Sequence, residues 1–365
     1  MTFADKPLRR HRGPSIADVA RLTGVSGQTV SRVANGRHNV DADTRERVLA
    51  AMREVGYRPN SAARALRNGQ FRSIGVIVFE LSSFGNTRTL DAIAAAATTS
   101  GYAVTLLPVL DASQEAVSGA FSRLGEQVVD CVIILIEAHT LDDAEVPLPD
   151  GLPVVVVDSS AHYDCPIVDT DQAQGARLAT EHLLDLGHST VWHLGGPPSS
   201  FAATRRLQSW EKTLTDRGCP VPHVLFGDWS AESGYGAGFQ LADNPEVTAI
   251  FVANDQMALG LLRALHERGR AVPADVSLVG FDDTEGATHF WPPLTTVRQT
   301  FTEVGQRSVG ALITEIETGE HHHRPVIVPT ELTVRNSTAP PAERGDKANR
   351  PGAATAGSFG DIEMG

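Results

Sequence analysis

The sequence predicts an all-α helix-turn-helix headpiece followed by an α/β core of two doubly wound lobes. Short amphipathic segments with good cap residues fill positions 15–66, which is typical of a small helical unit. From residue 73 onward, continuous Val/Ile/Leu runs alternate with helical segments, as in buried parallel strands. The chain of 365 residues, 41% of them hydrophobic, is long enough for two or three domains.

The first helix is predicted from a cap and an apolar face. Ser15 stands at an N-cap position, and Asp18 three residues later completes a capping box. Apolar residues then follow at helical spacing, namely Ile16, Val19 and Ala20.

A tight turn at residues 23–25 ends that helix, and Ser26 caps a second one over about 27–34, with Val30 and Val33 on one face. A third helix follows, for which Asp43 and Glu46 form the predicted capping box. Its apolar stripe consists of Val48, Leu49, Met52 and Val55. Three short helices with a Gly-containing turn between the first two make a helix-turn-helix.

The second helix carries side chains that suit DNA. Gln28 can pair bidentately with adenine, and Arg32 suits guanine or phosphate. Short polar side chains suited to phosphate contacts surround them, namely Ser26, Thr29, Ser31 and Asn35. The alternative is a plain three-helix packing unit with a solvated polar face.

Two long motifs run through this region, DVARLTGVSGQTVSRVANG and TRERVLAAMREVGYRPNSAARAL. On these motifs the region resembles the lactose/galactose repressor (LacI/GalR) family of bacterial transcriptional regulators. The resemblance implies a hinge that becomes helical on operator DNA, with Asn60, Ala63 and Leu66 as further DNA contacts. Leu66 matches the leucine that the family inserts between base pairs, and such wedges kink the duplex. Leu66 could instead be a core leucine, although the arginines on either side of it argue against burial.

One position departs from the family pattern on the DNA side. Gly27 stands at the first position of the second helix, where family members commonly carry a base-reading side chain. Base specificity there is therefore expected to be relaxed or to depend on Gln28.

The charge is divided between the two parts of the chain. The net charge is −13, but residues 1–72 hold 14 Lys/Arg against 6 Asp/Glu (+8), and the remainder holds 17 against 38 (−21). A basic head on an acidic body is expected where only the head meets DNA.

Composition indicates a soluble cytoplasmic protein. The N-terminus lacks an apolar signal-peptide core, and no run reaches the length of a membrane span. Three cysteines without metal-ligand spacing fit free thiols, and Cys131 lies in a predicted buried strand. We expect no cofactor and no metal, and we interpret the triple histidine at 321–323 as a surface loop.

The sequence from residue 73 onward predicts two successive sets of strands and helices. In the first set the strand candidates are SIGVIVF, AVTLLPV, DCVIILI and PVVVVD, with helices over about 87–100 and 114–125. In the second set the strand candidates are TVWHLGG, VLFGDW, AIFVAND and VSLVGFDD, with helices over about 174–186, 204–217, 231–241 and 257–268. Two such lobes with a cleft between them form a periplasmic-binding-protein-like core, which closes around its ligand by a hinge.

Polar residues follow several of the predicted strands. Asp158, Asn254 and Asp282 end strands, Trp229 follows another, and Arg206 lies in the next helix. Ligands of open α/β sheets bind at the carboxyl ends of strands. Carboxylate, amide, guanidinium and indole groups together suit a sugar. Taken singly, each of these residues could be a helix cap or lie in a solvent-facing turn.

The family resemblance extends through the body, to about residue 335, and is closest to the lactose repressor branch. It rests on GGPPSSFAATRRLQSW, GDWSAESGY, FVANDQMALGLLRAL and VSLVGFDDTEGATHFWPPLTTVRQ. It implies that Arg206, Asn254 and Asp282 hold effector hydroxyls, that Trp229 and Phe301 line the pocket, and that Asp158 is an acidic pocket residue. Ala202 departs from that branch, which has a pocket serine there, so the preferred sugar is left open.

The predicted organisation is a headpiece (1–59), a hinge and linker (60–72), a two-lobed core (73–337) and a disordered tail (338–365). The first lobe comprises about 73–171 and 301–328, and the second about 172–300 and 329–337. The tail lacks heptad leucines, so we expect a homodimer rather than the tetramer of the lactose repressor.

The predicted function is a repressor that binds near-palindromic operator DNA and responds to a galactoside or glucoside, with the sugar acting as an inducer. A corepressor-dependent regulator of the same family is the main alternative. A two-lobed sugar receptor would leave the head unexplained. An enzyme such as a dehydrogenase would need a phosphate loop, and LGGPPSS lacks the G-x-G-x-x-G spacing.

Overall fold

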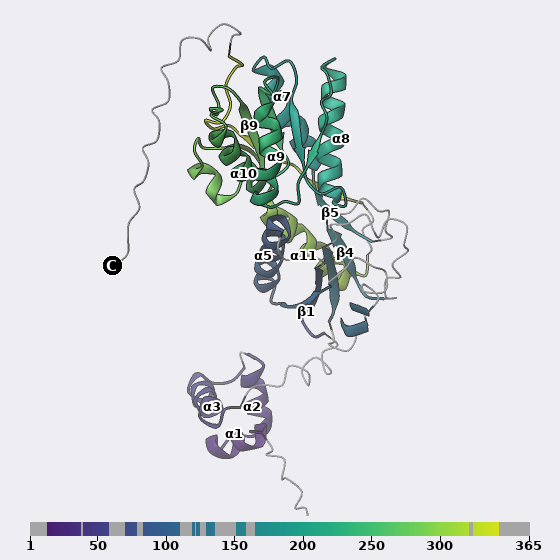
Figure 1. Cartoon of the computed structure of the whole chain (residues 1–365). Helices are drawn as coiled ribbons and strands as arrows, with labels where there is room; N and C mark the ends of the chain where they lie inside the picture. Colours follow the sequence, from purple (N-terminus) through teal and green to yellow (C-terminus); the bar gives the residue numbers. More distant parts are fainter. Residues whose placement is uncertain are drawn as a thin grey trace, which may run out of the picture. The chain divides into compact units, whose positions relative to one another are not determined.

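The computed structural model describes residues 13–37, 39–57, 70–78, 83–109, 119–120, 122–124, 129–135, 151–157, 165–320 and 324–342. The chain divides into two compact units between Phe71 and Arg72 (Figure 1). The first unit is helical, and the second contains two parallel-type sheets, which confirms the predicted fold class.

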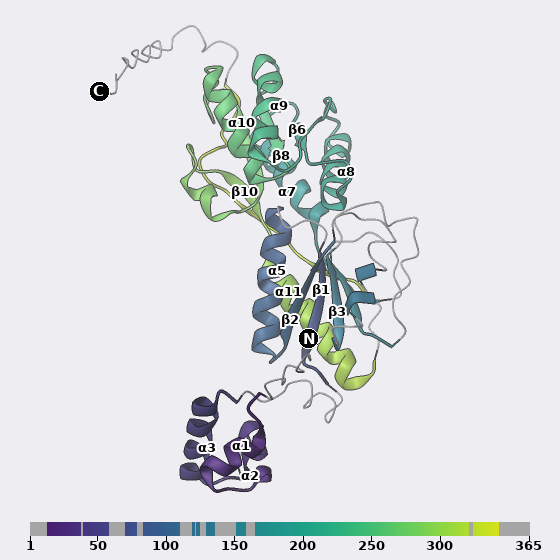
Figure 2. The same cartoon turned by 60° about the horizontal axis from the view of Figure 1, so that its bottom comes forward.

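The headpiece contains the three predicted helices, α1 (Ile16–Thr23), α2 (Gly27–Ala34) and α3 (Ala42–Val55). Figure 2 shows the three helices grouped closely together. Their core is formed by Val19, Val30, Val33, Val48, Ala51 and Met52.

Two of the predicted caps are confirmed and one is wrong. Ser15 and Asp18 form the capping box of α1, and the Ser26 hydroxyl accepts from the Thr29 amide at 3.1 Å. The cap of α3 is Asp41, whose carboxylate accepts from the Thr44 amide at 3.2 Å, so the predicted capping box at Asp43 and Glu46 is wrong. That helix starts earlier than its periodicity suggested.

The predicted stripe of α3 is also wrong at one position. Leu49 is 38% exposed, whereas its neighbours in the stripe, Val48 and Met52, are buried. The buried residues of α3 are Val48, Ala51 and Met52, so Ala51 replaces Leu49 on the buried face.

The first lobe is a six-stranded parallel sheet in the order β11-β5-β4-β3-β1-β2. Its strands are β1 (Ser73–Val78), β2 (Ala103–Pro108), β3 (Cys131–Leu135), β4 (Val154–Val157), β5 (Ile167–Thr170) and β11 (Val326–Val328). Helices α5 (Phe84–Thr99) and α11 (Phe301–Thr318) lie side by side and pack on one face (Figures 1 and 2).

Cys131, on β3, is fully buried in this lobe, and burial raises the pKa of its thiol to about 12, which confirms its core role.

The second lobe has the sheet order β12-β10-β9-β8-β6-β7, parallel except for the β10–β12 pair. Its strands are β6 (Trp192–Gly195), β7 (Leu225–Phe226), β8 (Ala249–Val252), β9 (Ser277–Asp282), β10 (Thr295–Arg298) and β12 (Glu331–Thr333). Its helices are α7 (Gln172–Asp185), α8 (Phe201–Asp216), α9 (Ala231–Asp243) and α10 (Asp255–Glu267), with a 3-10 turn η2 (Glu285–His289).

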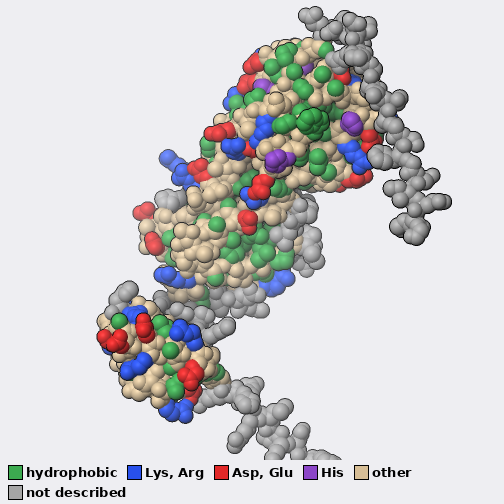
Figure 3. Space-filling model, turned by 90° about the vertical axis from the view of Figure 1, so that its left-hand side faces the viewer, with side chains coloured by type: hydrophobic (Ala, Val, Ile, Leu, Met, Phe, Trp, Pro, Cys, Tyr) green, Lys and Arg blue, Asp and Glu red, His purple; other side chains and the backbone are tan. Residues whose placement is uncertain are grey.

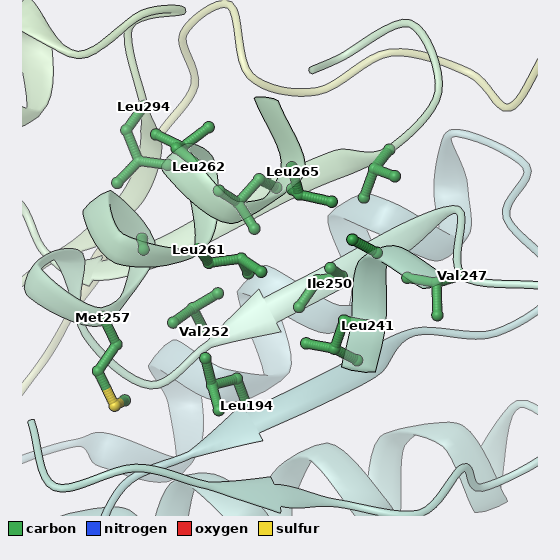
Figure 4. Packing of buried hydrophobic residues seen from close by; sticks show 14 of the residues in the cluster. Leu194, Leu241, Val247, Ile250, Val252, Met257, Leu261, Leu262, Leu265 and Leu294 are labelled. Carbon is green, nitrogen blue, oxygen red and sulfur yellow. The ribbon is translucent and has the colours of Figure 1, made fainter. Parts of the chain in front are cut away.

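Each face of the second sheet has its own apolar cluster. Helices α7 and α8 cover one face. The cluster beneath them includes Trp210 of α8 and the strand residues Phe251 and Phe281. Helices α9 and α10 cover the other face, where Figure 4 shows leucines of α10 packed over strands β6 and β8. Both faces of the sheet are therefore buried, which explains why its strands read as continuous apolar runs.

The described chain crosses between the two lobes three times. The crossings follow β5, β10 and β11 and lead into α7, α11 and β12. The amide of Gln172, at the first crossing, donates to the amide oxygen of Gln299, at the second, at 3.2 Å. The Thr330 amide, at the third, donates to Gln174 at 2.8 Å. Buried or part-buried hydrogen bonds of the Gln172 and Gln174 side chains thus connect the first crossing to the other two.

Several helices begin two or three residues before the predicted start, because polar residues that looked like strand ends or loops are their caps. Side chains of Asp171, Ser200 and Asn254 accept hydrogen bonds from the first turns of α7, α8 and α10. The ordered chain also continues past residue 338, where the predicted tail begins, since Ser277 exchanges two hydrogen bonds with Ala339. No helix in the described part of the chain is long and apolar enough to cross a membrane.

Candidate functional site

The predicted recognition face of the headpiece lies on α2. Gln28 and Arg32 are one turn apart and exposed, and within the described headpiece no hydrogen bond or ion pair engages either side chain. They are therefore open to an external partner. Figure 3 shows Lys and Arg side chains of the headpiece interspersed with acidic ones on the face in view.

The other predicted DNA contacts on α2 also serve the helix itself. The Ser26 hydroxyl caps the helix and lies 2.9 Å from the Thr29 hydroxyl. At the other end, the Asn35 amide donates to the Ser31 carbonyl at 2.6 Å and lies 3.2 Å from its hydroxyl. These four side chains shape the ends of α2, which leaves Gln28 and Arg32 as its unengaged groups. The predicted hinge contacts Asn60, Ala63 and Leu66 lie outside the described residues.

A cavity of about 620 Å³, including its opening to solvent, lies between the two lobes. Residues of both lobes line it, and five of the six predicted effector residues are among them, namely Arg206, Trp229, Asn254, Asp282 and Phe301. The sixth, Asp158, lies outside the described residues.

Arg206 is the central cation of the cavity. It lies on α8 and is only 4% exposed. Its Nε donates to the Gln172 side chain at 2.8 Å, its Nη1 donates to the Ala253 carbonyl, and its Nη2 lies 3.8 Å from Asp282. The guanidinium also lies over the Phe281 ring, 3.7 Å from its centroid. A buried guanidinium held on so many sides is fixed in orientation before any ligand arrives.

Arg206, Gln172, Gln299 and Asp282 form a closed ring of polar contacts. Gln172 receives from Arg206 and donates to Gln299, which in turn donates to Asp282 at 2.6 Å. All four side chains are buried. Because Gln172 and Gln299 belong to interlobe crossings, the ring connects Arg206 and Asp282 in the cavity to two of the crossings.

The backbone at Asp282 is in an unusual conformation. Its φ of 106° lies in a region that side chains rarely adopt, and such strain concentrates at ligand sites. Burial raises the pKa of its carboxyl to about 6, against the opposing effects of Arg206 and Gln299. The neighbouring Asp283 serves structure, since it pairs with Arg298 and Arg335.

Trp229 and Asn254 are held against each other. The Asn254 side chain accepts from the Met257 amide at 2.9 Å, which caps α10, and donates to the Trp229 carbonyl at 3.0 Å. Asn254 is therefore a helix cap as well as a cavity residue. The Trp229 ring packs on Gly196, where a Cβ would overlap it, and its backbone φ is 72°.

The first lobe supplies the opposite wall. Phe301 begins α11 and meets Phe84 of α5 edge to face, with ring centroids 6.1 Å apart. Ala202 lines the cavity one helical turn before Arg206, so the missing hydroxyl noted in the sequence lies within the site.

Sequence reasoning missed further cavity residues, namely Ser83, Asn86, Thr89, Asp169, Gln172 and Gln299. Gln172 and Gln299 do follow strands, so the rule that singled out Asp282 could have found them. Asp255, at 0% exposure, is instead structural, because it accepts from Thr296 and from the Thr284 amide.

Comparison with known proteins identifies the family. The model described as bacterial regulatory proteins, lacI family, matches residues 15–60, and a periplasmic binding protein-like domain matches 180–338. The chain is 38% identical to the lactose operon repressor of Escherichia coli (strain K12) over 90% of this chain and 91% of that protein. It is 35% identical to the regulator CelR of Thermobifida fusca over 90% and 100%, respectively.

Solved structures agree with the sequence relatives. A lac repressor dimer bound to operator and the anti-inducer ONPF matches with a TM-score of 0.79 and 36% identity, covering 90% of this chain and all of that one. A CelR–cellobiose complex matches with a TM-score of 0.65 and 31% identity, covering 89% and 99%. The chain belongs to the lacI family of bacterial regulatory proteins, DNA-binding transcriptional regulators controlled by small effectors, as its sequence motifs predicted.

Proposed function

We propose that this chain is a transcriptional repressor whose affinity for operator DNA is lowered by a neutral sugar bound between its two lobes. The observation that carries the proposal is the convergence of Arg206, Asp282, Asn254, Trp229 and Phe301 on one cavity. Charged and amide groups suit sugar hydroxyls, and an indole suits the apolar face of a sugar ring. Disaccharides or glycosides of galactose or glucose are the effector class, consistent with the lactose repressor and CelR–cellobiose relatives.

On the DNA side, α2 reads a half-site through Gln28 and Arg32, while Ser26, Thr29, Ser31 and Asn35 contact phosphate. Asn60, Ala63 and Leu66 form a hinge that contacts the operator centre. Two copies of the chain bind a near-palindromic operator as a homodimer, as in the lac repressor dimer structure. The protein acts in the cytoplasm and carries out no chemistry of its own.

The domain assignment follows from this function. Residues 1–59 bind DNA, 60–72 link, and 73–337 sense the sugar. Within the sensor, the ring through Gln172 and Gln299 carries the ligand state to the crossings between the lobes. A typical coupling free energy of about 1–3 kcal/mol is enough to release DNA when affinity lies near its threshold.

The test uses near-palindromic duplexes selected by the purified full-length protein from a random pool. Operator release is then measured by fluorescence anisotropy against galactosides, glucosides and their disaccharides. Release by a neutral sugar, lost in Arg206→Ala, is the expected result. Release at unchanged sugar concentration in Arg206→Ala would contradict the pocket assignment.

The same assay distinguishes the alternative of a corepressor-dependent regulator of the same family. A ligand that tightens operator binding instead of weakening it would identify a corepressor.

A further inference from the structure

Asp169 has a carboxylate oxygen that the described protein does not satisfy. The residue lies on β5, in the first lobe, is 1% exposed and lines the cavity. Its Oδ2 accepts from Arg205, whereas its Oδ1 is buried and has no hydrogen-bond partner in the described structure. Leaving a buried acceptor unsatisfied costs about 1–3 kcal/mol, and more when it is charged. A ligand in the cavity that donates a hydrogen bond to this oxygen would explain why the protein leaves it unpaired.

The partner of Asp169 comes from the other lobe. Arg205 lies on α8, four residues after Phe201, so both are on one stripe of the helix. Phe201 is 2% exposed and packs into a cluster of the first lobe that includes Ile77 and Leu107. The adjacent stripe, Ala202 and Arg206, lines the cavity. Helix α8 thus contacts the first lobe with one stripe and the ligand space with the next.

Among the described residues that line the cavity, each carboxylate lies beside an arginine. Asp169 pairs with Arg205, and Asp282 lies beside Arg206. An ammonium or carboxylate group on the ligand would add a buried charge without a counter-charge, which is costly. A neutral hydroxyl adds none and supplies the donor that a carboxylate oxygen requires.

We propose that Asp169 is a specificity-determining contact, whose free Oδ1 accepts a hydrogen bond from one hydroxyl of a neutral sugar effector. The inference rests on the proposed function, since it takes the cavity ligand to be a sugar. Oδ2 remains with Arg205, so the sugar hydroxyl joins a contact that spans the two lobes. The protein thereby recognises a single hydroxyl at the Asp169–Arg205 pair, which also joins the two lobes.

The experiment uses the full-length protein and isothermal titration. Methyl β-D-galactoside, methyl β-D-glucoside, lactose and cellobiose are titrated first, followed by the monodeoxy analogues of the tightest binder. Asp169→Asn is the test variant. Asp171→Asn is the matched control, since Asp171 is two residues away, caps α7 and does not line the cavity, and asparagine is an equally good cap.

We expect Asp169→Asn to weaken the parent sugar roughly 10- to 100-fold, the equivalent of one hydrogen bond to a charged group. With one monodeoxy analogue the same substitution has almost no effect, because the hydroxyl that Asp169 reads is already absent. Asp171→Asn binds the whole series as the unchanged protein does. The 2-amino-2-deoxy analogue binds no more tightly than the neutral parent.

Unchanged affinity of Asp169→Asn, or an equal loss for every analogue, would overturn the inference, since a purely structural role weakens all sugars alike. Tighter binding of the amino sugar would overturn the neutral-ligand assignment. If Asp169→Asn does not fold, the Asp169→Asn/Arg205→Gln double variant removes both charges and is expected to show the same analogue-selective loss. Failure of every sugar to bind the unchanged protein would refute the proposed function itself, a result seen before any variant is made.

Discussion

The recognition helix and the interlobe cavity use the same chemical groups in opposite ways. On α2, the amide of Gln28 and the guanidinium of Arg32 are exposed and unengaged within the described headpiece. In the cavity, the amide of Gln172 and the guanidinium of Arg206 are buried and hydrogen-bonded to each other at 2.8 Å. DNA reading needs groups that are free to adapt to bases and phosphates, whereas a selective cavity needs groups already fixed in place.

The difference implies different consequences of mutation. Polar groups in the cavity contribute to folding as well as to binding, so their loss lowers stability. The two unengaged side chains of α2, Gln28 and Arg32, make no contact that supports the fold of the described headpiece, so their loss should leave stability nearly unchanged.

The largest effect is expected for Arg206→Met. It removes the only cation of a buried ring, so that Gln172 loses a donor and the Asp282 carboxylate loses its counter-charge, and it should lower the free energy of unfolding by about 3–5 kcal/mol. Urea unfolding measures this, and operator release measures the loss of the sugar response. Arg32→Met is the control and should change stability by less than about 0.5 kcal/mol while weakening DNA binding. Similar unfolding free energies for the two variants would remove the contrast.

Gly260→Ala tests whether the cavity depends on helix packing beneath it. Helices α9 and α10 follow Trp229 and Asn254, and a Cβ at Gly260 would overlap the Ala231 carbonyl of α9. We expect a loss of about 3 kcal/mol in thermal unfolding, together with weaker sugar binding.

Gly310→Ala on α11 is the matched control for Gly260→Ala. A Cβ there meets nothing within 4 Å, so alanine should stabilise the helix by about 0.5–1 kcal/mol. If Gly260→Ala were as stable as the unchanged protein, α9 and α10 would be able to move apart without loss of stability.

Buried carboxyls of the second lobe predict a pH dependence. Burial, and secondarily the charge of Asp282, raises the pKa of Asp255 from its ordinary value of 3.8 to about 7. Between about pH 4 and pH 7 the folded protein therefore holds a proton that the unfolded chain has released. Stability falls as pH rises through this window and levels off above it.

Asp255→Asn should remove this contribution. Its amide can donate to the Thr296 hydroxyl while its oxygen accepts from the Thr284 amide, so both native contacts have a substitute. We expect the slope of unfolding free energy against pH to flatten by about 1.4 kcal/mol per pH unit between pH 5 and 7. An unchanged slope would mean that Asp255 is ionised throughout.

The smallest effect on the protein is expected for Gln28→Ala. It should leave the unfolding midpoint unchanged and cost about 1–2 kcal/mol of operator affinity, with relaxed preference at one base pair. Competition between the selected operator and single-base variants measures this. A uniform loss across all variants would indicate a phosphate contact instead.

Local patterns predicted much of the fold and part of the cavity. The apolar positions Val30 and Val33 and the Ser26 cap followed from neighbours in the sequence, and so did the apolar strands of both lobes. The position of Asp282 at the carboxyl end of a predicted strand was enough to predict that it lines the cavity, and it does.

Long-range pairing was beyond the sequence. Gln172 and Gln299 are 127 residues apart, and only the return of the chain to the first lobe brings their side chains together. Asn254 shows a second limit, because one short amide at a strand end both caps α10 and lines the cavity, and the sequence does not separate the two roles. The choice of Asp41 over Asp43 as a cap depends on the preceding loop, which periodicity does not describe.

The ring through Arg206, Gln172, Gln299 and Asp282 sets a rule for redesign of this sensor. Substituting a ring member to admit a new inducer would alter the hinge contacts as well, so recognition and response would change together. Ala202 lines the cavity but carries no polar contact of the ring. Biosensor libraries that vary Ala202 and its apolar neighbours, with the ring left intact, should yield new sugar preferences with the switch preserved.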